Sequence, residues 1–305
     1  MSKQSSEFPS FLRILLATDC STVSGAAFCC ALDLAQAFHS RLTVLKTVKP
    51  AETDATEPQA SDPSLGHAFT SAPSDSSGLV SHALARGIEC QVSTESGHPA
   101  DAILRQARAM QADLIVLGVD LTRGHEPFPL ETIVETVLRK SPCPVLAVGP
   151  ISVTHRARRP HSQPVLFATD FHRTTTRAIA YAAALSESCH TELHCLHVLP
   201  RVLQSSQKME VIPTILTCAL RQVACSVVGN PVCAVTFGSE VSQAIVEYAR
   251  EHDAATVVLG VRQASMTGTG LAPHIAYRVI AEAPCPVLTV PFGRDSDETQ
   301  PAFHT

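Results

Sequence analysis

Three short blocks of sequence occur twice in this chain, in the same order. An Ala-Thr-Asp triplet at residues 17–19 returns at 168–170, an offset of 151 residues. A Val-Leu-Gly-Val block at 116–119 returns at 258–261, and a Pro-Cys-Pro-Val-Leu block at 142–146 returns at 284–288. Blocks that repeat in one order indicate a duplicated domain. The two halves of the chain are therefore expected to share one fold.

Length and composition fit two α/β domains. The 305 residues exceed what one hydrophobic core usually serves, and each half has an ordinary domain size of roughly 100–150 residues. Hydrophobic residues make up 45% of the chain, aromatic residues only 5%, and tryptophan is absent. An aliphatic composition of this kind is typical of buried parallel strands that helices cover on both faces.

Charge, cysteine usage and apolar runs exclude several kinds of partner. A net charge of −5 gives no basic footprint for nucleic acid. Residues 1–10 lack the features of a signal peptide, and no stretch reaches the roughly 18 apolar residues of a membrane span. The 11 cysteines are scattered without a Cys-x-x-Cys motif, so we expect reduced, buried thiols. These features predict a cytoplasmic protein with neither nucleic acid nor membrane as a partner.

Hydrophobic periodicity predicts strands that alternate with helices throughout the chain. In the first half, strands are expected at 12–18, 42–48, 88–93, 113–118 and 145–148, with helices at 22–39, 79–86, 99–110 and 131–139. In the second half, strands are expected at 165–169, 193–198, 232–237, 256–260 and 287–290, with helices at 175–188, 211–227, 241–251 and 273–281. Residues 50–77 are rich in Pro, Ser and Ala and are expected to form a loop.

This alternation requires right-handed crossovers and a parallel sheet, with ligands expected beyond the carboxyl ends of the strands. We place domain 1 at residues 8–150, a linker at 151–163, domain 2 at 164–294 and a C-terminal tail at 295–305. The linker contains Arg156, Arg158 and Arg159 and shows no apolar period.

The repeated blocks resemble the universal stress protein family, over nearly the whole chain and as two tandem copies. The matching features are the opening strand that leads to Asp19 and Asp170, the strand that runs into Gly118 and Gly260, and the closing Pro-Cys-Pro-Val-Leu block. The resemblance implies two five-stranded parallel sheets of the nucleotide-binding, Rossmann-like type found in adenine nucleotide alpha hydrolases. It also implies that the two domains pair through their last strands, at 145–148 and 287–290. Association into a homo-oligomer and an unknown protein partner stay open.

Members of this family that bind ATP share a pattern after the fourth strand, namely Gly, two residues, Gly, nine residues, Gly and Ser or Thr. Such glycines let backbone N–H groups approach phosphates, and the N-terminus of the following helix favours their charge. Counting from Gly118 puts Leu121 and Glu131 at the second and third glycine positions, while Thr132 keeps the hydroxyl. The first copy therefore retains two of the four positions.

Glu131 would oppose a bound phosphate, although it also suits an ordinary helix start. A carboxylate about 4 Å from a phosphate charge costs roughly 4 kcal/mol at an effective dielectric constant near 20, which is nearly a thousandfold in affinity. A negative charge is equally favourable in the first turn of a helix that binds nothing. The residue alone does not separate the two interpretations.

The second copy departs further from the ATP-binding pattern. Counting from Gly260 gives Gln263, Pro273 and His274, so only the first glycine remains. Proline is comfortable as the first residue of a helix, so an ordinary helix start also accounts for Pro273. Gly268 and Gly270 could form a displaced anion-binding nest, which keeps a site in this half open.

Other candidate residues carry weaker signals. In ATP-binding relatives the aspartate equivalent to Asp19 and Asp170 lies near the base and ribose, yet an aspartate before a helix is also a common cap. His194 and His197 differ in strand parity and should point to opposite faces, which argues against a metal site. His98 and His172 follow strand ends on the expected ligand side. Cys143 and Cys285 would sense oxidants only if they were exposed and of low pKa.

Three functions fit these observations. The first is a non-catalytic stress-response module for binding or regulation, with a degraded ATP motif, so that neither a cofactor, a metal nor a catalytic residue is expected. The alternative is an ATP- or ADP-binding protein with slow ATPase activity, which would use Asp19 or Asp170 with Thr132 or the loop of Gly268 and Gly270. The third is a structural scaffold whose pocket is filled by Glu131 or His274. Nucleophile-elbow, Walker and zinc-protease motifs are all absent from the sequence.

Overall fold

The computed structural model describes residues 8–18, 22–48, 76–119, 133–152, 163–171, 175–201, 211–225, 227–228, 230–262 and 273–292. The predicted loop at 50–77 lies almost wholly outside these residues, as do most of the predicted linker and the whole predicted tail. The limits that we set for the domains, linker and tail therefore stay predictions. None of the helices in this part of the chain is long and apolar enough to cross a membrane.

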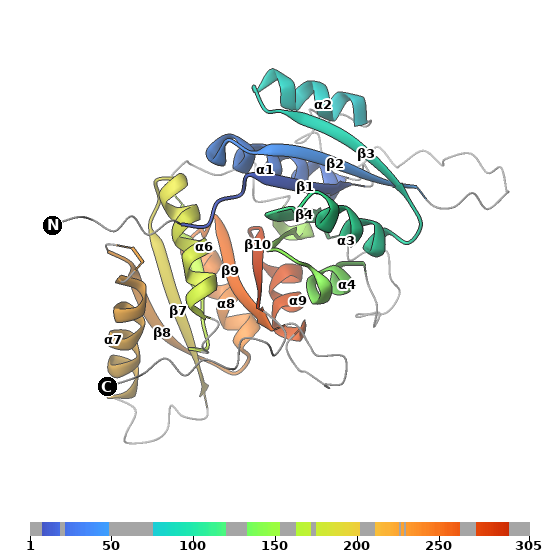
Figure 1. Ribbon diagram of the computed structural model, residues 1–305. Coiled ribbons are helices and arrows are strands. Elements are labelled where there is room, and N and C mark those ends of the chain that lie inside the picture. Colours follow the sequence, from blue (N-terminus) through green and yellow to red (C-terminus); the bar gives the residue numbers. More distant parts are fainter. Residues whose placement is uncertain are drawn as a thin grey trace, which may run out of the picture.

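The described residues form a single sheet of ten strands, in the order β3-β2-β1-β4-β5-β10-β9-β6-β7-β8 (Figure 1). In the first half the strands are β1 (Arg13–Thr18), β2 (Arg41–Val48), β3 (Cys90–Ser96), β4 (Leu114–Gly118) and β5 (Val145–Val148). In the second half they are β6 (Val165–Ala168), β7 (Leu193–Pro200), β8 (Val232–Gly238), β9 (Thr256–Arg262) and β10 (Val287–Phe292). All strand pairs are parallel except β5 with β10.

Helices cover both faces of this sheet and complete the predicted alternation. They are α1 (Thr22–Phe38), α2 (Ser76–Ala85), α3 (Pro99–Ala109) and α4 (Ile133–Lys140) in the first half, and α6 (Thr175–Ser188), α7 (Ile212–Cys225), α8 (Val241–Glu251) and α9 (Pro273–Glu282) in the second. Apolar residues of α1, α2, α6 and α7 pack in a core on one face, and those of α3, α4, α8 and α9 pack in a core on the other. The α/β fold class predicted from the sequence is confirmed.

Strand β3 begins two residues later than predicted, because Ile88 belongs to the end of helix α2 and not to the strand. The sequence predicts a strand at 88–93, whereas β3 spans Cys90–Ser96. The amide of Ile88 donates to the carbonyl of Ala83 at 3.0 Å, and Gly87 adopts a φ of +72°. Ile88 therefore belongs to the turn that closes the C-terminus of α2, where a glycine in the left-handed conformation is common.

The two halves are joined edge to edge by β5 and β10, as predicted. Leu288 lies opposite Leu146 in an antiparallel ladder, between the pairs Val287 with Ala147 and Thr289 with Val145. The hydroxyl of Thr289 also donates to the carbonyl of Val145 at 3.1 Å. Both cores continue across this joint, since each contains residues of β5 and of β10.

Gly149 allows the close contact between the halves just beyond this ladder. A Cβ at this position would overlap the main-chain carbonyl oxygen of Ile280, which belongs to α9 of the other half. A main-chain atom cannot rotate away as the end of a side chain can. The two backbones would therefore have to separate to admit any other residue.

We predict that Gly149→Ala destabilises the protein. The added methyl group must displace α9 from the end of β5, and overpacking of this kind typically costs about 1–3 kcal/mol. Thermal and urea unfolding should show a lower midpoint, while Leu84→Ala, on the exposed side of α2, should leave the midpoint near that of the parent. An unchanged midpoint for Gly149→Ala would contradict the close contact.

Candidate functional site

The candidate site in each half lies where two neighbouring strands end. In the first half Ala17 of β1 lies opposite Leu117 of β4, so Thr18 is beside Gly118. In the second half Ala168 of β6 lies opposite Leu259 of β9. The chain therefore leaves β6 beside Gly260, at the edge where the topology predicts a ligand.

The structure describes three of the seven predicted site residues. Gly118 ends β4, Gly260 lies within β9, and Asp170 follows the last residue of β6 by two positions, with an exposed side chain. The other four lie outside the described residues, namely Asp19, Thr132, Gly268 and Gly270. Asp170 follows β6, and Gly260 lies on the neighbouring strand β9, so these two predicted residues are at the same edge of the sheet.

Gly260 is in contact with an aromatic ring that the sequence analysis did not assign to the site. A Cβ at position 260 would lie only 2.8 Å from Cε1 of Phe292, the last residue of β10. Val290 is the register partner of Gly260, and Phe292 follows it by two residues. Any side chain at 260 would press on the end of this ring, which would have to shift. Packing against Phe292 is therefore one reason for a glycine at 260, and the glycine is not in itself a sign of a phosphate cradle.

The first half has a different residue at the position of Phe292. Val148 is the register partner of Gly118, as Val290 is of Gly260. Two residues past Val148 the chain has Pro150. The aromatic contact with the glycine is therefore specific to the second half.

A short turn after β6 positions Asp170. The hydroxyl oxygen of Thr169 accepts the amide of Phe171 at 3.0 Å, and Phe171 adopts a φ of +62°. The Nδ1 atom of His197 lies 2.8 Å from the carbonyl oxygen of Thr169, and the rings of His197 and Phe171 are 4.7 Å apart. Because a carbonyl oxygen only accepts, Nδ1 of His197 carries the hydrogen in this bond. His197 therefore supports the turn, a role that the sequence analysis missed.

Asp170 does not cap the following helix. Helix α6 begins at Thr175, five residues further along the chain. An N-cap residue directly precedes the first helical residue. Of the two roles that the sequence left open for Asp170, capping of α6 is thus excluded by position.

Helices α3 and α8 begin at the same edges, with different residues at their N-caps. The N-cap of α3 is His98 and that of α8 is Glu240, and neither side chain makes a capping hydrogen bond. Glu240 instead forms an ion pair with Arg278 of α9. The second half thus places the carboxylate of Glu240 at its ligand edge. The ion pair also occupies Arg278, a cation that could otherwise bind an anionic ligand.

The histidines of β7 do not form a metal site. The Nδ1 atom of His194 lies 3.3 Å from the hydroxyl oxygen of Tyr248 on α8, whereas His197 contacts Phe171 on the opposite face of the sheet. The predicted opposite orientation of these two side chains is confirmed. In the part of the chain that the structure describes, no group of three His, Cys, Asp or Glu residues could hold a metal ion.

The cysteines follow the sequence prediction only in part. Cys143 and Cys285 are buried, and burial raises the pKa of the Cys143 thiol to about 12, which opposes a role as an oxidant sensor. The prediction of buried thiols is wrong for Cys189, Cys218 and Cys225, which are exposed. Cys218 and Cys225 lie on α7, where the charged residue Arg221 is also exposed. All cysteines in the described residues are free thiols.

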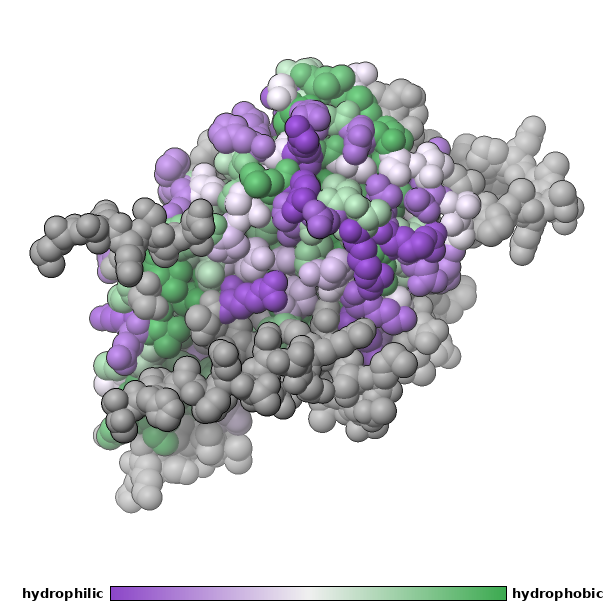
Figure 2. Space-filling view, viewed as in Figure 1, coloured by the Kyte–Doolittle hydropathy of each residue, from purple (hydrophilic) through white to green (hydrophobic). Residues whose placement is uncertain are grey.

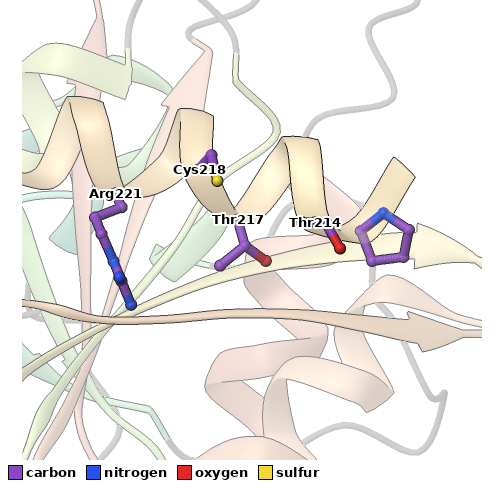
Figure 3. A pocket seen from close by; sticks show the side chains of 5 residues that line it. Thr214, Thr217, Cys218 and Arg221 are labelled. Carbon is purple, nitrogen blue, oxygen red and sulfur yellow. The ribbon is translucent and has the colours of Figure 1, made fainter. Parts of the chain in front are cut away.

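A hollow of about 270 Å³ lies along α7, away from the predicted site. It is lined by Pro213, Thr214, Thr217, Cys218 and Arg221. Figure 3 shows Thr214, Thr217 and Arg221 following one another along the helix and pointing to the same side. These lining residues include neither a carboxylate nor a histidine. The hollow therefore offers no acid–base pair.

The chain belongs to the universal stress protein family. The model of this family matches residues 10–149 and again residues 161–291. Comparison with curated protein sequences gives no match.

Solved structures of similar proteins share the fold. One is a protein from Pseudomonas aeruginosa UCBPP-PA14 described as a universal stress protein, with 18% identity and a TM-score of 0.66 over 93% of this chain and 94% of the other. A universal stress protein from Archaeoglobus fulgidus DSM 4304 has 20% identity and a TM-score of 0.61 over 92% and 98%. A protein of unknown function from Pseudomonas aeruginosa PAO1 has 18% identity and a TM-score of 0.62, with 93% of each chain covered.

We predict that the protein loses stability below neutral pH through His194. Burial lowers the pKa of His194, and the nearby His252 acts in the same direction against the opposing effect of Glu192. A histidine whose pKa is lower in the folded state binds fewer protons there, so its stabilising effect is complete above an unfolded pKa of about 6.5 and is lost as the pH falls below it.

Urea unfolding between neutral and mildly acidic pH would test this prediction. The difference in unfolding free energy between the parent and His194→Gln should shrink as the pH falls. A Leu84→Ala variant, which removes an exposed side chain that does not titrate, should instead run parallel to the parent. Parallel curves for His194→Gln would contradict the prediction.

Proposed function

We propose that this chain is a non-catalytic module for binding or regulation, of the universal stress protein type, in which the second half does not hold ATP in the usual geometry. The observation that carries the proposal is the contact of Phe292 with Gly260. It gives the last remaining glycine of the second motif a packing role. Together with Gln263, Pro273 and His274 at the other motif positions, it leaves this half without the features of a phosphate cradle.

Charge supports the same proposal. Glu240 lies at the N-terminus of α8, where the helix dipole favours an anion and where the carboxylate already supplies one. Its ion pair with Arg278 leaves that cation engaged within the protein. In the first half, Glu131 stands at the third glycine position of the motif. An anionic ligand would meet negative charge in both copies.

The second candidate is an ATP- or ADP-binding protein with slow ATPase activity in its first half. This candidate is favoured by Gly118 and Thr132, which keep two positions of the ATP-binding pattern. It is also favoured by Pro150, which replaces the aromatic residue of the second half. Gly97, next to the start of α3, has no atom within 4 Å of where a Cβ would lie. The first half is therefore the place to look for a retained ligand.

Calorimetric titration with ATP, ADP and AMP separates the two candidates. We predict no heat of binding for the parent at millimolar nucleotide. The variant Glu131→Gly removes a carboxylate whose cost near a phosphate is roughly 4 kcal/mol, so it should gain up to about a thousandfold in affinity. Micromolar binding by the parent would overturn the proposal, and release of phosphate from bound ATP would support the second candidate.

Two further variants test the second half. We predict that His274→Ser, which restores the hydroxyl of the motif, does not create binding while Phe292 is present. The double variant Phe292→Ala with His274→Ser opens the space beside Gly260, and Phe292→Leu is its control of similar bulk. Binding by His274→Ser alone would contradict the assigned role of the aromatic ring. If none of the variants binds nucleotide, capture of a protein partner is the next experiment.

A further inference from the structure

Strands β3 and β8 are the two outer strands of the sheet, and the pairing register makes them directly comparable. Leu16 lies opposite Val44, which lies opposite Val92 of β3. In the second half Phe167 lies opposite Cys195, which lies opposite Cys233 of β8. Leu16 and Phe167 are separated by the 151-residue offset of the duplication. Val92 and Cys233 are therefore equivalent positions in the two copies.

The two outer strands differ in polarity at four equivalent positions. In β3 the residues on either side of Val92 are polar, namely Gln91, Ser93, Thr94, Glu95 and Ser96. Their equivalents in β8 are Val232, Ala234, Val235, Thr236 and Phe237. The whole of β8 lacks a charged residue, and Val232 is 40% exposed. One copy thus has a polar outer strand and the other an apolar one.

Ion pairs accompany the outer strand of the first half. Glu95 of β3 pairs with Arg105 of α3 at 3.3 Å, and Glu89, just before β3, pairs with Arg41 at 2.9 Å. Charges on an outer strand prevent another strand from adding to its unpaired backbone groups. The positions equivalent to Glu95 and Glu89 are Thr236 and Asn230, which carry no charge. The second half has lost this protection at the same two positions.

Helix α7 extends the apolar outer surface of β8. Its 14 residues contain a single charged residue, Arg221, while Val211 just before the helix and Ile215 within it are 58% and 59% exposed. In Figure 2 apolar side chains gather at the left of the molecule, where Figure 1 places α7 and β8. Arg221 lines the hollow of Figure 3 on this helix, together with Thr217 and Cys218.

We propose that β8 is an interaction surface for a second copy of this chain, with β8 pairing antiparallel to its counterpart about a twofold axis and the two α7 helices flanking the contact. An uncharged strand can meet its own copy without repulsion, although each chain carries a net charge of −5. A twofold interface needs only one self-complementary surface. The same kind of contact already joins β5 to β10 within the chain.

The C-terminal segment of the same chain is a less suitable occupant of this edge. Residues 293–305 include one arginine, two aspartates and a glutamate. Such a composition has low β-propensity and would return charges to the outer strand. A second β8 offers a matching apolar strand instead.

Thr236→Lys is the variant that tests the contact. It places a charge at the position equivalent to Glu95. Glu247 of α8 occupies the position equivalent to Arg105, the ion-pair partner of Glu95. The folded chain can therefore accept the lysine as β3 accepts its glutamate. The variant puts a positive charge on the same edge of both chains, and repulsion between the two edges should weaken the dimer by roughly tenfold or more. The control is Val92→Lys on β3, where the parent residue is 41% exposed. Val232→Lys is a second variant on β8, for use if Thr236→Lys fails to fold.

Sedimentation and amide hydrogen exchange of the full chain across the micromolar range provide the two readouts. We expect the parent to reach twice the chain mass, Val92→Lys to follow it, and the β8 variants to dissociate. Exchange of the β8 amides should slow as the concentration rises, while exchange of the β3 amides stays constant. A parent that remains monomeric overturns the proposal. A dimer that survives both β8 variants, or β8 exchange that is independent of concentration, also overturns it.

Discussion

The antiparallel ladder between β5 and β10 is the interaction on which the rest of this structure depends. Each parallel sheet would otherwise leave its last strand exposed as an edge, with unpaired backbone groups. The ladder satisfies these groups for both halves at once and makes both cores continuous. It also fixes the relative direction of the two sets of strands, because strands are parallel within each half and antiparallel across the joint. The carboxyl ends of the two sets of strands therefore lie at opposite ends of the common sheet.

This geometry separates the two candidate sites, so the copies were free to differ. The first half has His98 and Pro150 where the second has Glu240 and Phe292. Each difference concerns a side chain at a ligand edge and leaves the strand register unchanged. The fold therefore constrains the buried strands of the two copies in the same way, while the edges have diverged in charge and in shape.

The sequence predicted the features that depend on local pattern. The repeat predicted the duplicated fold, and the four-residue apolar strand at 145–148 was placed correctly because it is bounded by Pro144 and by Gly149. The contact of Phe292 with Gly260 could not be predicted, since it depends on the register between two strands whose paired residues are 30 positions apart in the chain. The roles of Ile88 and His197 were missed because each acts through a backbone partner supplied by tertiary structure. The exposed cysteines of α7 were misjudged because their apolar neighbours indicated burial.

The ion pair between Glu95 and Arg105 has a consequence for how many chains one assembly can contain. Strand-edge pairing at both ends of a sheet would let chains add without limit and form a fibre. With one edge protected by charge and the other pairing as proposed, growth would stop after a single addition. In the proposed assembly, the ion pair on β3 would limit the number of chains to two. The charge on one copy would in this way make an apolar edge on the other copy compatible with a closed assembly.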